Sequence, residues 1–394
     1  MTRHPRSLLG GATALAIAGL LWAAAPALAD ITIPTQPRPP GPPNLDLLKP
    51  IEDILSSKPA LIVMGKDPRV QASTFGEGEA GGGDAGGSDS TSGASTAAAA
   101  KPSPVLQAAG GFLVPFRNPA PAFSRGILIT RDYSDFPVQT EPHIAVDPAD
   151  PDHVVVATID YNSPSVTDYV TYDGGVTWEG PFPTGYLPED EATGGDPVLD
   201  FDRKGNLYLA TISIGTEEFT VGPEYTSSIV SSIAVAQSKD GGYTWPSIIS
   251  TARSNVSITG QQIDAQGHLR GSVQIGFFDK PWISIGRNPA KPDQDVIYAV
   301  YVEFITYYDI IYTGELPILL PREVSSTIKL VHSEDQGTTW SDPIAVSPVV
   351  RRAYGTTPGV ALPGVENNDR TLQGPRVEAA MDGTVYVAWL DTTD

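Results

Sequence analysis

From about residue 112 onward, apolar and polar residues alternate in short runs of the kind that form β-strands. Four of these regions follow one plan: a proline precedes an alternating apolar run, a turn-rich break follows, and a second apolar run comes after the break. Each region therefore predicts two antiparallel strands joined by a turn. The four leading prolines are Pro142, Pro197, Pro281 and Pro375.

An octapeptide of the form Ser/Thr-x-Asp-x-Gly-x-Thr-Trp ends a third β-rich run in three of the four regions. Its Asp can accept hydrogen bonds from backbone amides of its own turn, and its Gly can adopt a positive φ angle. Its Trp offers a flat surface for packing. The motif thus predicts a tight turn between a third and a fourth strand. Its key residues are Asp173, Gly175 and Trp178 in the first copy, Asp240, Gly242 and Trp245 in the second, and Asp335, Gly337 and Trp340 in the third.

Four antiparallel strands repeated along a chain are typical of a β-propeller. A β-sandwich would not explain four similar units, and a β-solenoid would have a shorter and more regular repeat. The expected fold class is therefore all-β, a propeller of four-stranded antiparallel blades. Three complete blades and the first two strands of a fourth can be traced, so about three and a half blades are expected in residues 112–394.

The octapeptide resembles the Asp box, or BNR repeat, of the sialidase (neuraminidase) superfamily, and the likeness covers roughly residues 140–394. The resemblance implies a six- or seven-bladed propeller that is truncated here at its C-terminus. It also implies that the box is structural and lies on the face opposite the ligand, so that its Asp and Trp residues are not catalytic. Xyloglucanase-type glycosidases and sortilin-type receptors share the box, so it indicates the fold and leaves the activity open.

Charged residues stand beside the leading proline in all four regions, where the loops that enter the innermost strands of a propeller gather around its channel. Glu141, Asp196 and Asp279 come one or two positions before the proline, and Arg376 follows it. These carboxylates are candidates for a general acid/base pair or for oxygen ligands of Ca²⁺. The alternative, which we weigh more heavily, is that each carboxylate caps its own loop.

Two long inserts supply candidate ligand contacts. An aromatic insert could form a platform for sugar stacking, or it could bury its tyrosines against a neighbouring blade. Arginines suit the carboxylate of an acidic sugar, because a guanidinium binds it through two hydrogen bonds. None of the family's catalytic residues is transferred to this chain, and the segment Phe116–Pro119 matches the family's Phe/Tyr-Arg-Ile/Leu-Pro motif imperfectly. The candidates are Tyr307, Tyr308, Tyr312, Arg253 and Arg270.

The N-terminal third has a different composition. Residues 1–29 combine a basic start, an apolar core and the small-x-small sequence Ala27–Ala29, which together predict a secretory signal peptide. Residues 30–111 are rich in Pro, Gly, Ser and Ala and predict a disordered spacer. Two small apolar islands near residues 45–55 and 61–64 could form a short helix and a strand that dock on the main domain, although a spacer is the favoured interpretation.

The 46 acidic and 25 basic residues give a net charge of −21, which argues against a broad nucleic-acid or anionic-membrane interface. The chain has no Cys, and its five His residues are scattered. We expect no cofactor, no metal site and no membrane span after signal removal; Ca²⁺ is chemically conceivable but not indicated. Two functions stay open: a secreted sialidase-like glycoside hydrolase acting on extracellular glycans, and a non-catalytic propeller that binds a glycan or a surface protein.

Overall fold

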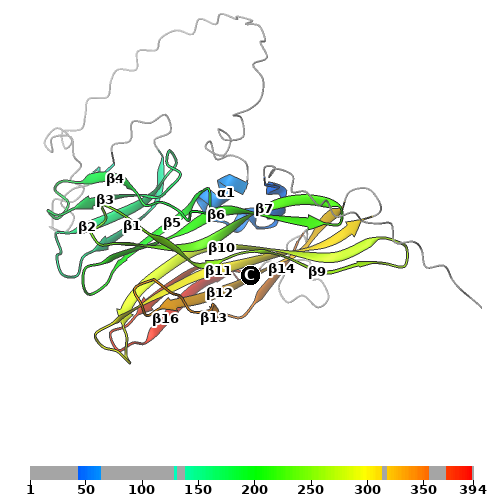
Figure 1. Ribbon diagram of the computed structural model, residues 1–394. Coiled ribbons are helices and arrows are strands. Elements are labelled where there is room, and N and C mark those ends of the chain that lie inside the picture. Colours follow the sequence, from blue (N-terminus) through cyan, green and yellow to red (C-terminus); the bar gives the residue numbers. More distant parts are fainter. Residues whose placement is uncertain (1–42, 64–127, 131–137, 313–316, 355–369, 393–394) are drawn as a thin grey trace, which may run out of the picture.

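The computed structural model describes residues 43–63, 128–130, 138–312, 317–354 and 370–392 (Figure 1). These residues are predominantly β-structure, arranged in antiparallel sheets. The predicted signal peptide, most of the predicted spacer and the segment Phe116–Pro119 lie outside the described residues. Within the described part, no helix has the length and apolar character needed to cross a membrane.

Four sheets follow one another along the chain, and each contains one strand that carries a leading proline. The first contains β1 (Gln139–Val146), β2 (Val154–Asp160), β3 (Thr167–Thr171) and β4 (Glu179–Pro183) in that order. The second contains β5 (Ala192–Phe201), β6 (Leu207–Val221), β7 (Glu224–Ser238) and β8 (Ile248–Arg253). The third contains β9 (Val256–Ile263), β10 (Leu269–Arg287), β11 (Asp295–Tyr312), β12 (Ile318–Ser333), β13 (Ile344–Ala345) and β14 (Val350–Ala353), and the fourth contains β15 (Thr371–Ala379) and β16 (Val385–Thr392).

The innermost strands of successive sheets lie side by side: β1 contacts β5, β5 contacts β10, and β10 contacts β15. Side chains of one inner strand bind the backbone of the next. Asp200 of β5 accepts a hydrogen bond from the amide of Ile285 at 2.8 Å, and Ser284 of β10 accepts one from the amide of Ala379 at 3.1 Å. The antiparallel four-stranded units of the predicted fold are therefore present. A closed propeller ring is not shown by the described residues.

The second and third sheets depart from a regular blade because their strands are long. Strand β10 has 19 residues and β11 has 18, whereas β2 has 7. At roughly 3.3 Å per residue, the long strands run well beyond the first sheet and curl into a half-barrel (Figure 1). The half-barrel encloses a second apolar core, which includes Ile212, Phe277 and Phe304.

An N-terminal segment packs into this half-barrel, in contrast to the spacer that the sequence favoured there. Residues 43–63, named here the N-terminal strap, contain the 3-10 helix η1 (Leu45–Ile54) and the helix α1 (Ser57–Val63). Leu48 and Ile51 are fully buried in the half-barrel core. The sequence could not show this, because the strap alone has too few apolar residues to offset its ordering entropy. The concave sheet supplies the missing contacts.

Candidate functional site

The four inner strands share one backbone irregularity, located at the leading prolines. A β-bulge interrupts the pairing of β1, β5, β10 and β15 with their neighbours at this point. A proline has no N–H to donate to the ladder, which explains why the pairing breaks there. The residue before each proline has a positive φ: 52° at Glu141, 52° at Asp196, 51° at Lys280 and 53° at Gly374. This conformation costs about 1 kcal/mol for a residue other than glycine.

The three side chains at these strained positions meet in an ion cluster. The Lys280 ammonium donates hydrogen bonds to Asp196 Oδ1 at 2.9 Å and to Glu141 Oε1 at 3.3 Å. We refer to Glu141, Asp196 and Lys280 as the inner-strand cluster. Asp196 is buried, whereas Glu141 and Lys280 are partly exposed, so solvent reaches one side of the cluster.

Burial dominates the electrostatics of Asp196. Its pKa is raised above the usual value because burial disfavours the charged form; a hydrogen bond with Glu141 and the Lys280 charge act in the opposite direction, and Asp279 adds to the rise. Burial lowers the pKa of Lys280, but the Asp196 and Glu141 carboxylates raise it by more. The cluster therefore combines a carboxyl that retains its proton more readily than usual with a firmly charged ammonium.

Arg376 lies next to this cluster and is held by an aromatic stack. Its guanidinium carbon is 3.6 Å from the ring centroid of Trp282, and the Trp282 ring meets the His143 ring edge-on at 4.9 Å. Burial, with a smaller contribution from Arg376, lowers the pKa of His143 to about 4, so its imidazole is neutral at pH 7. Its Nδ1 accepts a hydrogen bond from the amide of Leu199. The exposed Arg376 guanidinium is thus oriented by stacking, with Asp196 close enough to act on its pKa.

Asp279, the third carboxylate that the sequence singled out, is turned toward other partners. It is fully buried, and it accepts hydrogen bonds from the backbone amide and the hydroxyl of Ser56 in the N-terminal strap. Lys280 occupies the position that corresponds to Glu141 and Asp196. Aligning the four regions on the residue directly before the proline, without regard to its charge, would have identified it.

The side chains of four of the five candidate ligand contacts have partners outside the inner-strand cluster. Arg253 pairs with Asp190 at 2.7 Å, and Arg270 pairs with Asp264 at 3.0 Å. Tyr308 is buried, and its hydroxyl donates a hydrogen bond to the Leu47 carbonyl of the N-terminal strap. The other two tyrosines belong to the same long strand: Tyr307 lies beneath the guanidinium groups of Arg322 and Arg351, and the backbone of Tyr312 pairs with Leu269.

The octapeptides lie at the end of each sheet opposite to the bulge, and all three repeat one hydrogen-bond network. In each copy the Asp carboxylate accepts from the first residue's hydroxyl and from the amide and hydroxyl of the Thr four positions later. The hydroxyl of the first residue also accepts a hydrogen bond from the amide of the motif's Gly, which is Gly175, Gly242 or Gly337. Trp245 and Trp340 pack beside core clusters, and the ring of Trp178 lies near Gly175. These residues form turns and do not approach the inner-strand cluster.

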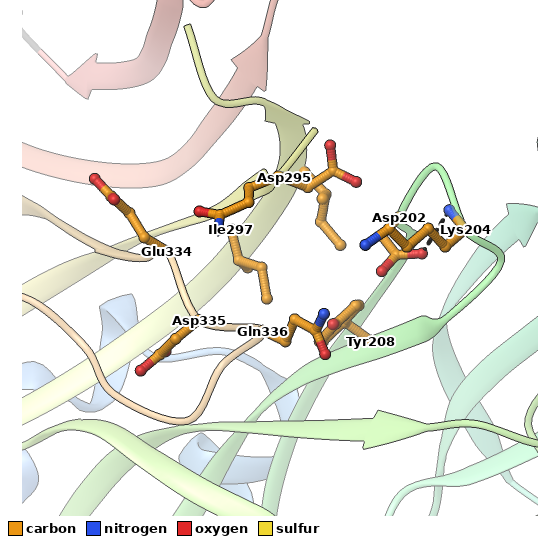
Figure 2. Close-up of a pocket in the computed structure, with 10 residues that line it drawn as sticks. Asp202, Lys204, Tyr208, Asp295, Ile297, Glu334, Asp335 and Gln336 are labelled. Carbon is orange, nitrogen blue, oxygen red and sulfur yellow. Dashed lines mark hydrogen bonds between the residues drawn. The ribbon is translucent and has the colours of Figure 1, made fainter. Parts of the chain in front are cut away.

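A cavity of about 330 Å³ opens beside the third octapeptide (Figure 2). Figure 2 shows Asp202 and Lys204 on one side of it and Glu334, Asp335 and Gln336 on the other. Asp202 already accepts hydrogen bonds from its own turn, and Asp335 from its octapeptide. Among the described residues, no group of three or more His, Asp or Glu side chains is placed to hold a metal ion. The cavity thus offers no donor set that points to a ligand.

Comparisons with known proteins add little beyond this geometry. No family model matches the chain, and no curated protein matches it. Among solved structures, a Hadza microbial sialidase is 11% identical, with a TM-score of 0.23, over 63% of this chain and 62% of that one. A leech intramolecular trans-sialidase is 11% identical, with a TM-score of 0.25, over 67% of this chain and 66% of that one.

A Trypanosoma rangeli sialidase is 8% identical, with a TM-score of 0.19, over 66% of this chain and 52% of that one. The chain thus spans less than two thirds of the first and third of these proteins. TM-scores of this size carry no argument about fold or activity.

Proposed function

We propose that this chain is a secreted, sialidase-like β-propeller that hydrolyses glycosidic bonds in extracellular glycans, with the inner-strand cluster as its acid/base site. The supporting observation is the conformational strain of the backbone at the three cluster residues. Gly374 occupies the same bulge in the fourth sheet and adopts its φ without strain, whereas Glu141, Asp196 and Lys280 do not. A repeated strain that glycine would relieve, at three side chains that converge, is typical of a functional site.

The chemistry fits two carboxyl groups in different states. Glycoside hydrolases use one protonated carboxyl as a general acid and a second carboxylate as a base or nucleophile. In this proposal Asp196 donates the proton, because its raised pKa favours the protonated form, and Glu141 is the second carboxylate. The cations Lys280 and Arg376 make the site suitable for an acidic sugar. Acid/base catalysis of this kind uses no cofactor.

The test is hydrolysis of a panel of 4-methylumbelliferyl glycosides, the sialoside included, by the purified chain. Asp196→Asn removes the proton donor and should lower the turnover rate by roughly 100-fold or more. Asp200→Asn is the matched control: Asp200 is a partly buried carboxyl of the same strand, outside the cluster, and its variant should retain activity. Equal activities of wild type and Asp196→Asn would contradict the proposal.

A second candidate is a non-catalytic propeller that binds a glycan or a surface protein. The observation that favours it is the Lys280 ammonium, which already engages both carboxylates and so competes with their use as acid and base. This candidate predicts saturable binding of a glycan without turnover on any member of the panel. It also predicts that Arg376→Ala weakens binding, which isothermal titration calorimetry would measure.

A further inference from the structure

The N-terminal strap contacts two inner strands at equivalent positions. The residue before the strained position is Asp279 in β10 and Gln373 in β15. Asp279 accepts hydrogen bonds from Ser56, and the Gln373 side-chain amide donates to the carbonyl of Ile54. Ile54 and Ser56, two positions apart in the strap, are thus bound at the bulges of two successive sheets.

The contact between Ser56 and Asp279 joins residues 223 positions apart and excludes solvent. The Ser56 amide is 2.9 Å from Asp279 Oδ2, and the Ser56 hydroxyl is 2.8 Å from Oδ1. Asp279 is 0% exposed and Ser56 is 3% exposed. The Ser56 amide donates to one oxygen of Asp279 and the Ser56 hydroxyl donates to the other, an arrangement that favours the ionised carboxylate. These bonds lower the pKa of Asp279, although burial raises it by more.

The strap is fixed in place by contacts that do not involve Asp279. Leu48 and Ile51 are 0% exposed. The Arg352 guanidinium donates to both carboxylate oxygens of Asp53 at 3.0 Å and to the Pro50 carbonyl at 3.1 Å. These contacts anchor the strap on the half-barrel. The position of Ser56 is therefore fixed independently of its hydrogen bonds to Asp279.

Several charged groups surround this contact. Lys280 and Asp279 are adjacent in sequence, and each contributes to the electrostatic environment of the other. Asp196 lies close enough for the Asp279 charge to act on it. Glu141 acts on both Asp196 and Lys280, and the Asp196 charge reaches Arg376. His143, beside Arg376, is uncharged at pH 7.

We propose that Ser56 is a positioning residue of the inner-strand cluster: its two hydrogen bonds hold the Asp279 carboxyl in place behind Lys280 and favour its ionised form, and thereby set the charge that Asp196 experiences. This inference rests on the proposed function only in treating the cluster as the working site. The strap is then a structural part of the site, although Ser56 lies 85 residues upstream of Glu141, the first cluster residue in the sequence.

The direction of the effect follows from charge. Without the Ser56 hydroxyl, the buried Asp279 carboxylate loses a hydrogen bond and takes up a proton more readily. The negative charge near Asp196 then decreases. Since that charge raises the pKa of Asp196, its loss lowers it. The Asp196 carboxyl would therefore ionise at a lower pH in Ser56→Ala than in wild type.

The experiment is an NMR titration of the full chain labelled with ¹³C at the aspartate carboxyl, in which Asp196→Asn identifies the Asp196 signal. We expect the Asp196 midpoint to fall by on the order of half a pH unit to one pH unit in Ser56→Ala. Ser56→Thr keeps a hydroxyl and should retain the wild-type midpoint. Asp53→Asn weakens the strap at Arg352 without touching Asp279 and should also retain it.

An unchanged midpoint in Ser56→Ala would overturn the inference, as would an equal shift in Asp53→Asn, because the effect would then come from strap docking in general. If Ser56→Ala does not fold, Asp279→Asn removes the same charge and must lower the Asp196 midpoint for the inference to stand. The titration needs no substrate, so its result is independent of whether the chain hydrolyses glycosides.

Discussion

Aspartates occur at both ends of the sheets, at the bulges and at the octapeptides, and their surroundings differ between the two ends. At the octapeptide end, hydrogen bonds from Thr177 lower the pKa of Asp173 to about 2, and those from Thr339 lower that of Asp335. At the bulge end, burial raises the pKa values of Asp196 and Asp279. The first set repeats the same contacts in every copy. The residues with the positive φ share one backbone conformation but carry a different side chain in each sheet.

This difference separates two reasons for a repeated residue. The octapeptide Asp binds donors of its own turn, so each sheet needs the same residue for the same local purpose. At the bulge, only the backbone angle repeats, while the side chain is Glu, Asp, Lys or Gly. Constant chemistry indicates a structural role. A constant backbone with varied side chains that converge indicates a site.

The largest effect should follow removal of the cation at the bulge end. Lys280→Met leaves Asp196 and Glu141 without their shared partner. Breaking a fully buried pair costs about 3–5 kcal/mol of unfolding free energy, and because Lys280 and Glu141 are partly exposed we expect about 2–3 kcal/mol here. A carboxyl whose pKa is raised in the folded state lowers the stability of the protein as the pH rises through that pKa. The cost should therefore be larger at pH 8 than at pH 5, as measured by urea unfolding at both values.

Lys291→Met provides the control, because Lys291 forms an exposed ion pair with Glu334 in the same sheet. Exposed pairs contribute little, so its cost should stay below about 1 kcal/mol at either pH. If the loss of unfolding free energy in Lys280→Met did not depend on pH, the contrast between the bulge end and the octapeptide end would not hold.

A smaller effect is expected at the octapeptide end. Asp240→Ala removes the hydrogen bonds from Ser238 and Thr244 and should cost about 1 kcal/mol at pH 7. Burial acts to raise the pKa of Asp240, but the hydrogen bonds from Thr244 and Ser238 lower it by more. Its contribution is thus present above the ordinary Asp pKa and is lost as the pH falls, the reverse of the trend at the bulge.

Urea unfolding at pH 7 and at pH 3 would measure this trend. Lys239→Ala, at an exposed position of the same turn, should change stability by less than about 0.5 kcal/mol. If the cost of Asp240→Ala grew in acid, the turn would not depend on an ionised carboxylate.

The smallest effect concerns the backbone alone. Gly374→Ala adds a methyl group at φ 53°, with no other atom within 4 Å of the new carbon, so only conformational strain is introduced. We expect a cost of about 1 kcal/mol in thermal or urea unfolding. No loss of stability would show that the bulge is unstrained, and the strain argument for the inner-strand cluster would then fail.

Part of this architecture could be predicted from local sequence. The four regions and three octapeptides indicated antiparallel four-stranded units, because strand alternation and turn chemistry are encoded in adjacent residues. The proximity of Glu141 and Asp196 also followed from their equal distance to a proline. The position of Lys280 was missed because acidic residues were sought there, although it directly precedes its proline as Glu141 and Asp196 do. Its pairing with both carboxylates comes from the structure.

The sequence by itself thus determined the repeating units, their turns and the positions of the residues that lead into each inner strand. The tertiary structure decided how far β10 and β11 extend, where the N-terminal strap binds and why Asp279 turns toward Ser56. These features depend on contacts between segments separated by 223 to 319 residues in the chain. Burial of such contacts depends on the whole half-barrel, and no local pattern of apolar and polar residues encodes it.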